Sequence, residues 1–350
     1  MVDDELQLAA LPLQRVCLLD FNHDACYAAI ENLTRSASEG IVPSRTVKES
    51  LFHGGLGKGG GCMTQITGCR RSIAFHHVWK SGGTSVLHAL STLSPTGRIM
   101  LDRCWKDESV CPRIRGRRGP DAPFYFTFVR HPVEHFVSGY VEMEHRSSIK
   151  EEEGDNSYGM HHYGFSPRLV KQSRGSRGRA LEFVCQYICG TLHAAGHTRL
   201  QASAFFACPR QGGGPSFDFI GKLEVADADW MRVGVSAKCP ALANSTLPSS
   251  ISSHPNTSAS SSDQTTQRVR QAMWQALGDW RLRVALEKLL AADFLLFNYS
   301  FGAPLIGAGH GAASSVPSDL GTRAARVGAA RNVGGDLATS AGCDWTCDST

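Results

Sequence analysis

Residues 80–85 read Lys-Ser-Gly-Gly-Thr-Ser and directly follow a short run rich in Ile, Ala, Phe and Val. An apolar stretch with helical spacing comes next, so the pattern predicts strand, glycine loop and helix. Such a loop presents consecutive backbone N–H groups and a helix N-terminus to an anion. Lys80 adds a mobile positive charge, and Thr84 and Ser85 add hydroxyl donors. This chemistry suits a phosphate or a phosphosulfate.

The order of residues in this loop differs from that of the common nucleotide-triphosphate loop. In GxxxxGK[ST] a glycine precedes the lysine and a hydroxyl residue follows it directly. Here Lys80 precedes both glycines, which predicts a tighter loop with the lysine at its start. A Gly-Gly turn at such a place can also be purely structural.

A second segment has the same strand-to-helix pattern and carries an arginine. Residues 124–129 are aromatic and β-branched, which is typical of a buried strand. Arg130 follows this strand and Pro132 begins a predicted helix that includes Ser138. Ligands of parallel α/β sheets bind outside the carboxyl ends of the strands. We therefore expect Lys80 and Arg130 to face one anion site, although a lone arginine at a strand end is usually an ordinary surface residue.

The whole chain of 350 residues, 42% of them hydrophobic, can bury a full α/β core. Alternating strand and helix signals occupy residues 70–302 and predict a P-loop-like α/β domain, with a central parallel sheet flanked by helices. Residues 1–69 are expected to form an N-terminal extension with a glycine-rich linker. Residues 244–266 read as a low-complexity insertion before a helix near 267–293, and we expect little order in the tail, 303–350.

Together the two segments resemble motifs of the membrane-type carbohydrate sulfotransferases. KSGGTS is similar to the family's PKTGGTS, and FVRHPVEHFVSGY to its FVRDPFERLVSAY. Trp79 replaces the proline, Ser81 a threonine and His131 the aspartate. Segments 217–230 and 286–301 resemble two later motifs, and the segment 197–211 weakly resembles an H-x-x-P-Q region. The ordered matches cover roughly residues 70–302.

The resemblance implies a PAPS-dependent sulfotransferase, in which 3′-phosphoadenylyl sulfate (PAPS) donates the sulfuryl group, and it gives each matched residue a role. The 5′-phosphosulfate would be held by Lys80, Ser81, Gly82, Gly83, Thr84 and Ser85. Lys80 would also stabilise charge on the bridging oxygen, and Arg130 and Ser138 would hold the 3′-phosphate. In-line geometry and positioned positive charge would then drive transfer. This chemistry needs no metal.

The proton acceptor for the acceptor hydroxyl is where the sequence departs from the family. Several relatives carry a base histidine between the two motifs, whereas residues 91–123 contain none. Histidine or a carboxylate can serve as this base. The candidates are Asp102, Asp107, Glu108, His76, His77, His161, His162 and His197. His76 and His77 lie nearest the loop and are the predicted bases, with packing or helix-dipole roles as the alternative. Glu224 and Asp227 are expected to be structural or substrate-side residues.

The resemblance implies a carbohydrate acceptor, which could be an anionic glycan. The net charge of +4 argues neither for nor against a polyanion. Arginine clusters within 113–118 and 168–179 would be either solvated loops or the lining of an anionic groove. Nucleic acid is disfavoured because the clusters lack interleaved aromatic residues. Two alternatives stay open: a nucleotide-dependent kinase, and a non-catalytic nucleotide- or glycan-binding module on the same fold.

Twelve cysteines and four N-x-[ST] sequons point to the secretory lumen, and the resemblance implies the Golgi. The sequons are at Asn32, Asn244, Asn256 and Asn298. Among the disulfides that the sequence allows are Cys104–Cys111, Cys208–Cys239 and Cys343–Cys347, and Cys185 and Cys189 read as structural thiols rather than a metal pair. The family is usually anchored by an N-terminal transmembrane helix. No apolar run here approaches the ~20 residues needed, so either the N-terminus is incomplete or the protein is not anchored in that way.

Overall fold

The computed structural model describes most of the region that carries strand and helix signals, together with two N-terminal helical segments. The described residues are 12–19, 23–38, 61–94, 122–155, 157–189, 192, 198, 200–202, 217–247 and 262–302.

Four strands form one sheet in the order β1-β2-β3-β4. Their bounds are Gly61–Thr64, Ile73–His76, Phe124–Val129 and Phe219–Lys222. β2, β3 and β4 are parallel, and β1 pairs antiparallel with β2 at one edge. Every residue of β2 and β3 is buried, which explains why both strands read as continuous apolar runs. The predicted α/β class with a central parallel sheet is confirmed.

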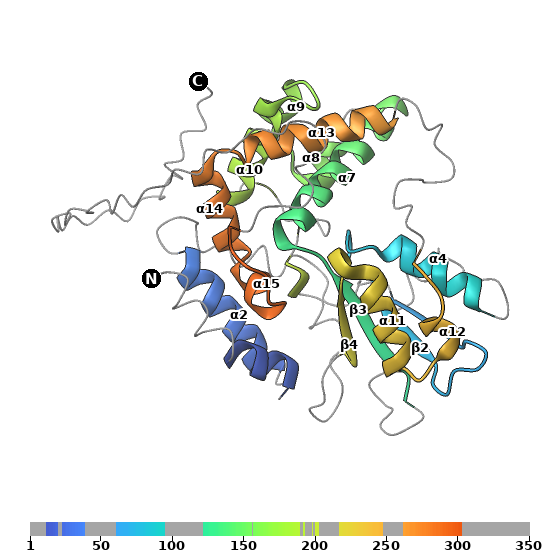
Figure 1. The fold of residues 1–350 in the computed structure, drawn as a ribbon. Helices are drawn as coiled ribbons and strands as arrows, with labels where there is room; N and C mark the ends of the chain where they lie inside the picture. Colours follow the sequence, from blue (N-terminus) through green and yellow to red (C-terminus); the bar gives the residue numbers. More distant parts are fainter. Residues whose placement is uncertain are drawn as a thin grey trace, which may run out of the picture.

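Two groups of helices accompany the sheet (Figure 1). One face is covered by α4 (Gly83–Leu93), α11 (Ala226–Ser236) and α12 (Pro240–Ala243). The other group shares a hydrophobic core with side chains of the opposite face of the sheet, and consists of α7 (Pro132–Glu152), α10 (Arg177–Ile188), α13 (Ser262–Ala276), α14 (Trp280–Leu289) and α15 (Ala291–Leu296). The shorter segments are η1 (Arg15–Leu19), α8 (Tyr158–Tyr163), α9 (Pro167–Lys171) and η3 (Leu223–Val225).

Alternate side chains of β3 enter two separate hydrophobic cores. Phe126 and Phe128 pack with Trp230 of α11, whereas Tyr125 and Val129 pack on the side of α7. Because successive side chains of a strand point to opposite faces, one strand contributes to both layers. Each buried aromatic side chain contributes roughly 1.5–3 kcal/mol. β3 therefore stabilises both hydrophobic cores.

Two segments that precede the predicted domain start at residue 70 also pack on the sheet and helices. β1 pairs with β2, and α2 (His23–Ser38) packs on α14 and α15. Cys17 and Ile30 are fully buried in the core on the α7 side of the sheet. The tail after residue 302 lies outside the described residues.

The helix predicted near 267–293 is in fact two helices. α13 ends at Ala276, and Asp279 caps α14 by accepting a hydrogen bond from the backbone N–H of Arg281 at 2.9 Å. Trp280 begins the second helix, and its side chain is 68% exposed. α13 begins at Ser262, inside the predicted low-complexity insertion.

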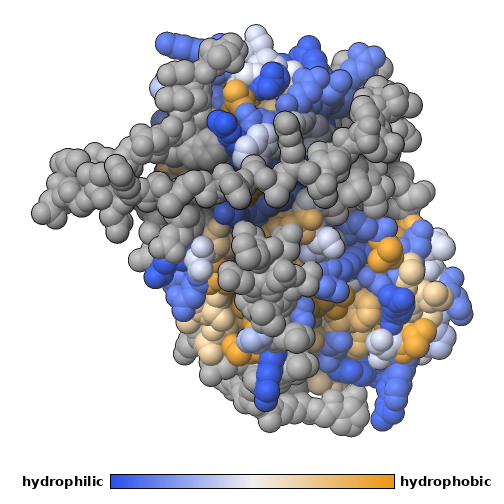
Figure 2. Space-filling view, turned by 60° about the vertical axis from the view of Figure 1, so that its left-hand side comes forward, coloured by the Kyte–Doolittle hydropathy of each residue, from blue (hydrophilic) through white to orange (hydrophobic). Residues whose placement is uncertain are grey.

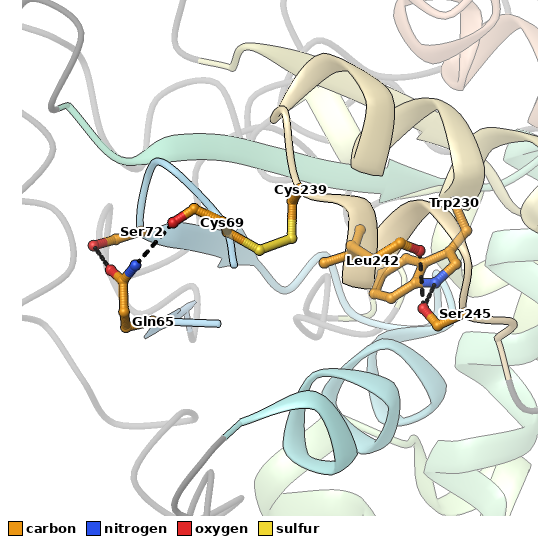
Figure 3. The surroundings of a disulfide bond; sticks show 7 residues. All are labelled: Gln65, Cys69, Ser72, Trp230, Cys239, Leu242 and Ser245. Atoms are coloured by element: carbon orange, nitrogen blue, oxygen red, sulfur yellow. Dashed lines mark hydrogen bonds between the residues drawn. A yellow bond between two sulfur atoms is a disulfide. The ribbon is translucent and has the colours of Figure 1, made fainter. Parts of the chain in front are cut away.

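A disulfide joins Cys69, which lies between β1 and β2, to Cys239, which precedes α12 (Figure 3). Beside it, the hydroxyl of Ser72 donates to Oε1 of Gln65 at 2.8 Å, and Nε2 of Gln65 donates to the carbonyl of Cys69 at 3.3 Å. The hydrogen bonds hold the β1–β2 connection together, and the disulfide fastens it to the helices that follow β4.

The predicted Cys208–Cys239 pair is wrong, because Cys239 is bonded to Cys69. A second disulfide joins Cys17 to Cys26 across the start of α2. Cys185 and Cys189 are both disulfide-bonded, so they are not free structural thiols. The other predicted pairs, Cys104–Cys111 and Cys343–Cys347, lie outside the described residues.

Hydrophilic residues dominate the upper part of the face in Figure 2, and hydrophobic residues gather in its lower part. Large apolar side chains that are exposed include Met231 and Val235 on α11 and Val284 on α14. Across the described part of the chain, no helix combines the length and apolar character needed to cross a bilayer.

Candidate active site

The loop between β2 and α4 is shaped by two left-handed residues. Gly82 has φ 76° and Lys80 has φ 63°. The left-handed conformation of Gly82 favours glycine, and a Cβ atom here would also lie 2.6 Å from Cδ1 of Leu223, so that this side chain would have to move. Gly82 is the N-cap of α4, and because glycine has no side chain, the first turn of the helix has no side-chain cap. The loop therefore places the uncapped N-terminus of α4 close to the carboxyl end of β2.

The second glycine is required by packing. A Cβ atom on Gly83 would lie 1.6 Å from Cδ2 of His77, because the imidazole lies directly against the start of α4. The side chain of His77 is buried with 5% exposure. The glycine that the sequence assigned to phosphosulfate binding thus also makes room for a histidine ring.

Lys80 forms an ion pair with a carboxylate of α7. Its Nζ lies 2.6 Å from Oε2 of Glu142, and Oε1 of Glu142 accepts from Nε of Arg146 at 2.7 Å. Burial lowers the pKa of Lys80, while Glu142 raises it. Burial opposes ionisation of Glu142, but the charge of Lys80 and hydrogen bonds from Lys80 and Arg146 lower its pKa to about 2. The carboxylate of Glu142 is therefore ionised at neutral pH and stabilises the charged form of Lys80.

Arg130 lies at the carboxyl end of β3 and is also paired with a carboxylate of α7. Its Nη2 donates to Oε2 of Glu134 at 3.2 Å, and the same oxygen accepts from Arg270 of α13. β2 and β3 are neighbours, so Lys80 and Arg130 follow adjacent strand ends.

Gln201 connects the two loops. Its Oε1 accepts from the hydroxyl of Ser81 at 2.9 Å and from the backbone N–H of Arg130 at 2.7 Å. Its Nε2 donates to the carbonyl of Arg130 at 2.6 Å. The carboxylate of Asp293 in turn accepts from the backbone N–H groups of Gln201 and Ala202, both at 2.8 Å. Burial raises the pKa of Asp293 to about 7, against the effect of these bonds.

Neither Gln201 nor Asp293 was predicted as a site residue, although both lie in segments that resembled family motifs. Gln201 stands at the glutamine of the weak H-x-x-P-Q match, and Asp293 lies in the segment 286–301. That similarity was the available signal, and it gave no role. Both residues are buried. Gln201 is bonded to the two loops, and Asp293 is bonded to the backbone of Gln201.

His135 of α7 also fastens the loop and was missed. Its Nε2 donates to the carbonyl of Trp79 at 2.7 Å, and its ring is buried. Burial lowers the pKa of His135 to about 4, although the bond to Trp79 raises it. Nothing in the sequence distinguishes this histidine from a packing residue.

Glu224 has a structural role, one of the two that the sequence predicted. Its Oε1 accepts from the backbone N–H of His131 at 2.6 Å, and its Oε2 accepts from the hydroxyl of Tyr299 at 2.7 Å. The His131 ring lies edge-on to Tyr299, with ring centroids 5.3 Å apart. The corresponding role beside α11 falls to Asp229 rather than Asp227, since Asp229 accepts from the backbone N–H of Lys222 at 2.6 Å.

The two predicted base histidines are both in the core. His76 is 3% exposed, with its ring edge-on to Tyr125 and Phe217. Burial lowers the pKa of His76 to about 4 and that of His77 to about 3. Their role as base stays a prediction, which this burial disfavours.

The other predicted site residues differ in accessibility. Thr84 is exposed and Ser85 is buried in the first turn of α4, and Ser138 is half-buried on α7. His161 and His162 are exposed on α8. Four base candidates lie outside the described residues: Asp102, Asp107, Glu108 and His197.

Three of the arginines within 168–179 form ion pairs with glutamates, so these three are neither a free groove lining nor simply solvated: Arg168, Arg174 and Arg179. Arg179 pairs with Glu144 at 2.7 Å, and Arg174 pairs with Glu144 at 3.4 Å and with Glu151. A polar cavity of about 420 Å³ lies here, lined by Glu151, Val170, Gln172, Arg174 and Arg179. The cluster within 113–118 lies outside the described residues.

The comparison with known families agrees with this arrangement of loops. A model of the sulfotransferase family matches residues 66–300. The chain belongs to the sulfotransferase family. Searches of curated proteins and of solved structures return no significant match. The family supports sulfuryl transfer in general, and the matched region contains the β2–α4 loop, Arg130 and Gln201.

Proposed function

We propose that this sulfotransferase moves a sulfuryl group from PAPS to a carbohydrate hydroxyl. The observation that carries the proposal is the placement of Lys80 and Arg130 after adjacent parallel strands, with Gln201 bonded to both loops. Two positively charged side chains and a helix N-terminus are what a nucleotide with two separated anionic groups requires.

The residues of the site fit such a nucleotide. The 5′-phosphosulfate would bind Lys80 and the start of α4, where Gly82 leaves the first turn uncapped. The 3′-phosphate would bind Arg130 and Ser138. Both cations now pair with carboxylates, Glu142 and Glu134, which the anionic groups of the nucleotide would replace. Ser81 would act on the shape of the loop, because its hydroxyl is bonded to Gln201.

The proposed transfer is a direct in-line displacement. The oxygen of the acceptor hydroxyl bonds to sulfur while the bond from sulfur to the bridging oxygen breaks. Negative charge develops on that bridging oxygen, and the ammonium of Lys80 stabilises it. The proton of the hydroxyl must pass to a base as the new bond forms.

A carbohydrate acceptor and a location in the Golgi lumen follow from the resemblance to the membrane-type carbohydrate enzymes. The disulfides Cys17–Cys26 and Cys69–Cys239 support an oxidising compartment. Any association with a membrane rests on the resemblance alone.

Calorimetric binding of 3′-phosphoadenosine 5′-phosphate (PAP) tests the proposed cofactor. Wild type should bind PAP, and Lys80→Ala and Arg130→Ala should each weaken binding by about tenfold or more, as expected for loss of a charge-assisted contact. Arg35→Ala on α2 is the control, because Arg35 pairs with Glu31 away from these loops. Failure of folded wild type to bind PAP would sink the proposal, and a screen of desulfated glycans with PAPS follows a positive result.

A further inference from the structure

One face of α7 lines the cation site. Glu134, Ser138 and Glu142 follow one another at intervals of four residues, so they share one face of the helix. Glu134 contacts Arg130 at one end of this face, and Glu142 contacts Lys80 further along. The carboxylate of Glu142 therefore lies at Lys80, beside the place where the sulfuryl group would be held.

Glu142 is accessible, unlike the histidines near the loop. Its side chain is 16% exposed, whereas those of His76 and His77 are buried in the core and His135 is bonded to Trp79. Of the acidic side chains for which the structure gives an ion pair, Glu142 is the one that contacts Lys80.

The surroundings of Glu142 would change when a phosphosulfate arrives. The charged and titratable groups that face it are Lys80 from the loop, Arg146 from α7 and Tyr163 from α8. A phosphosulfate that takes over Lys80 removes one of its two cations and brings negative charge close. Both changes make the carboxylate more basic, since an opposite charge favours its ionised form and a like charge disfavours it. Proton affinity would thus rise at the step that needs a base.

We infer that Glu142 is the general base of the reaction; this inference rests on the proposed function. The carboxylate takes the proton of the acceptor hydroxyl as that oxygen bonds to sulfur. The bond from sulfur to the bridging oxygen breaks, and its electron pair stays on the 5′-phosphate of PAP beside Lys80. The products are the sulfated acceptor, PAP and a protonated Glu142.

The experiment compares Glu142→Gln with wild type in two measurements. PAP binding is followed by calorimetry. Transfer from ³⁵S-labelled PAPS is followed with desulfated chondroitin and heparosan as acceptors, and as release of free sulfate with water as the acceptor. Glu31→Gln is the matched control: Glu31 and Arg35 form an i,i+4 pair on α2 with side chains 16% and 49% exposed, against 16% and 47% for Glu142 and Arg146.

Glu142→Gln should bind PAP within threefold of wild type or more tightly, and should lose about 100-fold or more in turnover, the usual effect of removing a general base. Sodium formate should restore part of the turnover of Glu142→Ala, because it supplies a carboxylate to the vacated space. Glu31→Gln should retain both properties.

Three results would contradict this assignment. Turnover of Glu142→Gln within threefold of wild type would overturn the base and leave the proposed function standing. Parallel loss of PAP binding and turnover would make Glu142 a support of the nucleotide site instead of the base. Wild type that neither binds PAP nor releases sulfate would overturn the proposed function and this inference with it.

Discussion

The side-chain amide of Gln201 is bonded to both backbone groups of Arg130, accepting from its N–H at 2.7 Å and donating to its carbonyl at 2.6 Å. The same amide oxygen accepts from Ser81, 120 residues earlier in the chain. One buried side chain thus fixes the ends of two strands that carry the cations of the site.

Gln201→Ala should destabilise the protein and weaken PAP binding together. The substitution leaves the hydroxyl of Ser81 and the backbone of Arg130 without partners in a buried place, which costs roughly 1–3 kcal/mol for each group left unsatisfied. Urea unfolding measures the first effect and calorimetry the second. Gln65→Ala is the control: Gln65 also makes two hydrogen bonds, but it is exposed, and we expect a loss of about 0.5 kcal/mol or less. Equal losses in the two variants would refute the role given to Gln201.

Gly83→Ala should be much more damaging than Gly68→Ala. The new methyl group would lie 1.6 Å from the ring of His77, whereas nothing lies within 4 Å of a methyl group on Gly68. Gly68 has φ 80°, so its substitution costs only the backbone strain of about 1–2 kcal/mol. The double variant His77→Ala/Gly83→Ala should recover part of the thermal stability lost in Gly83→Ala. If removing the ring gives no recovery, contact with His77 is not the reason for this glycine.

Stability should fall in acid because of His76, and His76→Phe should reduce that fall. Burial lowers the pKa of His76 to about 4, below the value near 6.5 of an unfolded histidine. The contribution to stability is therefore complete above pH 6.5 and is lost as the pH falls toward 4, because the unfolded chain binds the proton more readily. Between pH 7 and pH 5 this one group should account for about 2 kcal/mol.

Phenylalanine keeps an aromatic ring beside Tyr125 and Phe217 and removes the titration. Thermal melts of wild type and His76→Phe at pH 7 and pH 5 provide the comparison. The same drop in both proteins would mean that His76 titrates alike in the folded and unfolded states.

Removing the Cys69–Cys239 disulfide should cost more stability than removing Cys17–Cys26. The first closes a loop with a sequence separation of 170 and the second one of 9, and the loss of loop entropy in the unfolded chain grows with loop length. Paired serine variants, melted without reductant, should lose about 4–5 and about 2–3 kcal/mol respectively. A larger loss for the Cys17–Cys26 variant would show that packing around that bond outweighs chain entropy.

The strands could be predicted from the sequence, whereas the contacts that hold the site could not. The buried run 124–129 and the apolar run before Lys80 predicted two strands, and their alternation with helices predicted the parallel sheet. Partners far apart in the chain left no comparable signal: His135 and Trp79 are 56 residues apart, and Gln201 and Arg130 are 71. Such pairs depend on where helices cross the sheet, which periodicity does not encode.

The same limit explains why the positions of the histidines and of Glu142 relative to Lys80 could not be predicted. His76 and His77 stand beside the loop in the sequence, but the alternation of a strand and the start of α4 bury both rings. Glu142 lies on α7, two turns after the first turn that begins at Pro132. The direction of α7 brings its carboxylate to Lys80. Proximity along the chain and proximity in the site are different quantities here.

Because Gln201 joins Ser81 to Arg130, the spacing between the two cationic loops is set when the chain folds and not when a ligand arrives. The two loops are ordered before a ligand binds, so the entropic cost of ordering them does not reduce the binding free energy. A molecule with anionic groups at the right separation meets both loops at once, and its second contact benefits from a high effective concentration. A molecule with only one such group gains nothing from the second loop. The fold therefore selects ligands by the distance between two anionic groups, independently of their other chemical groups.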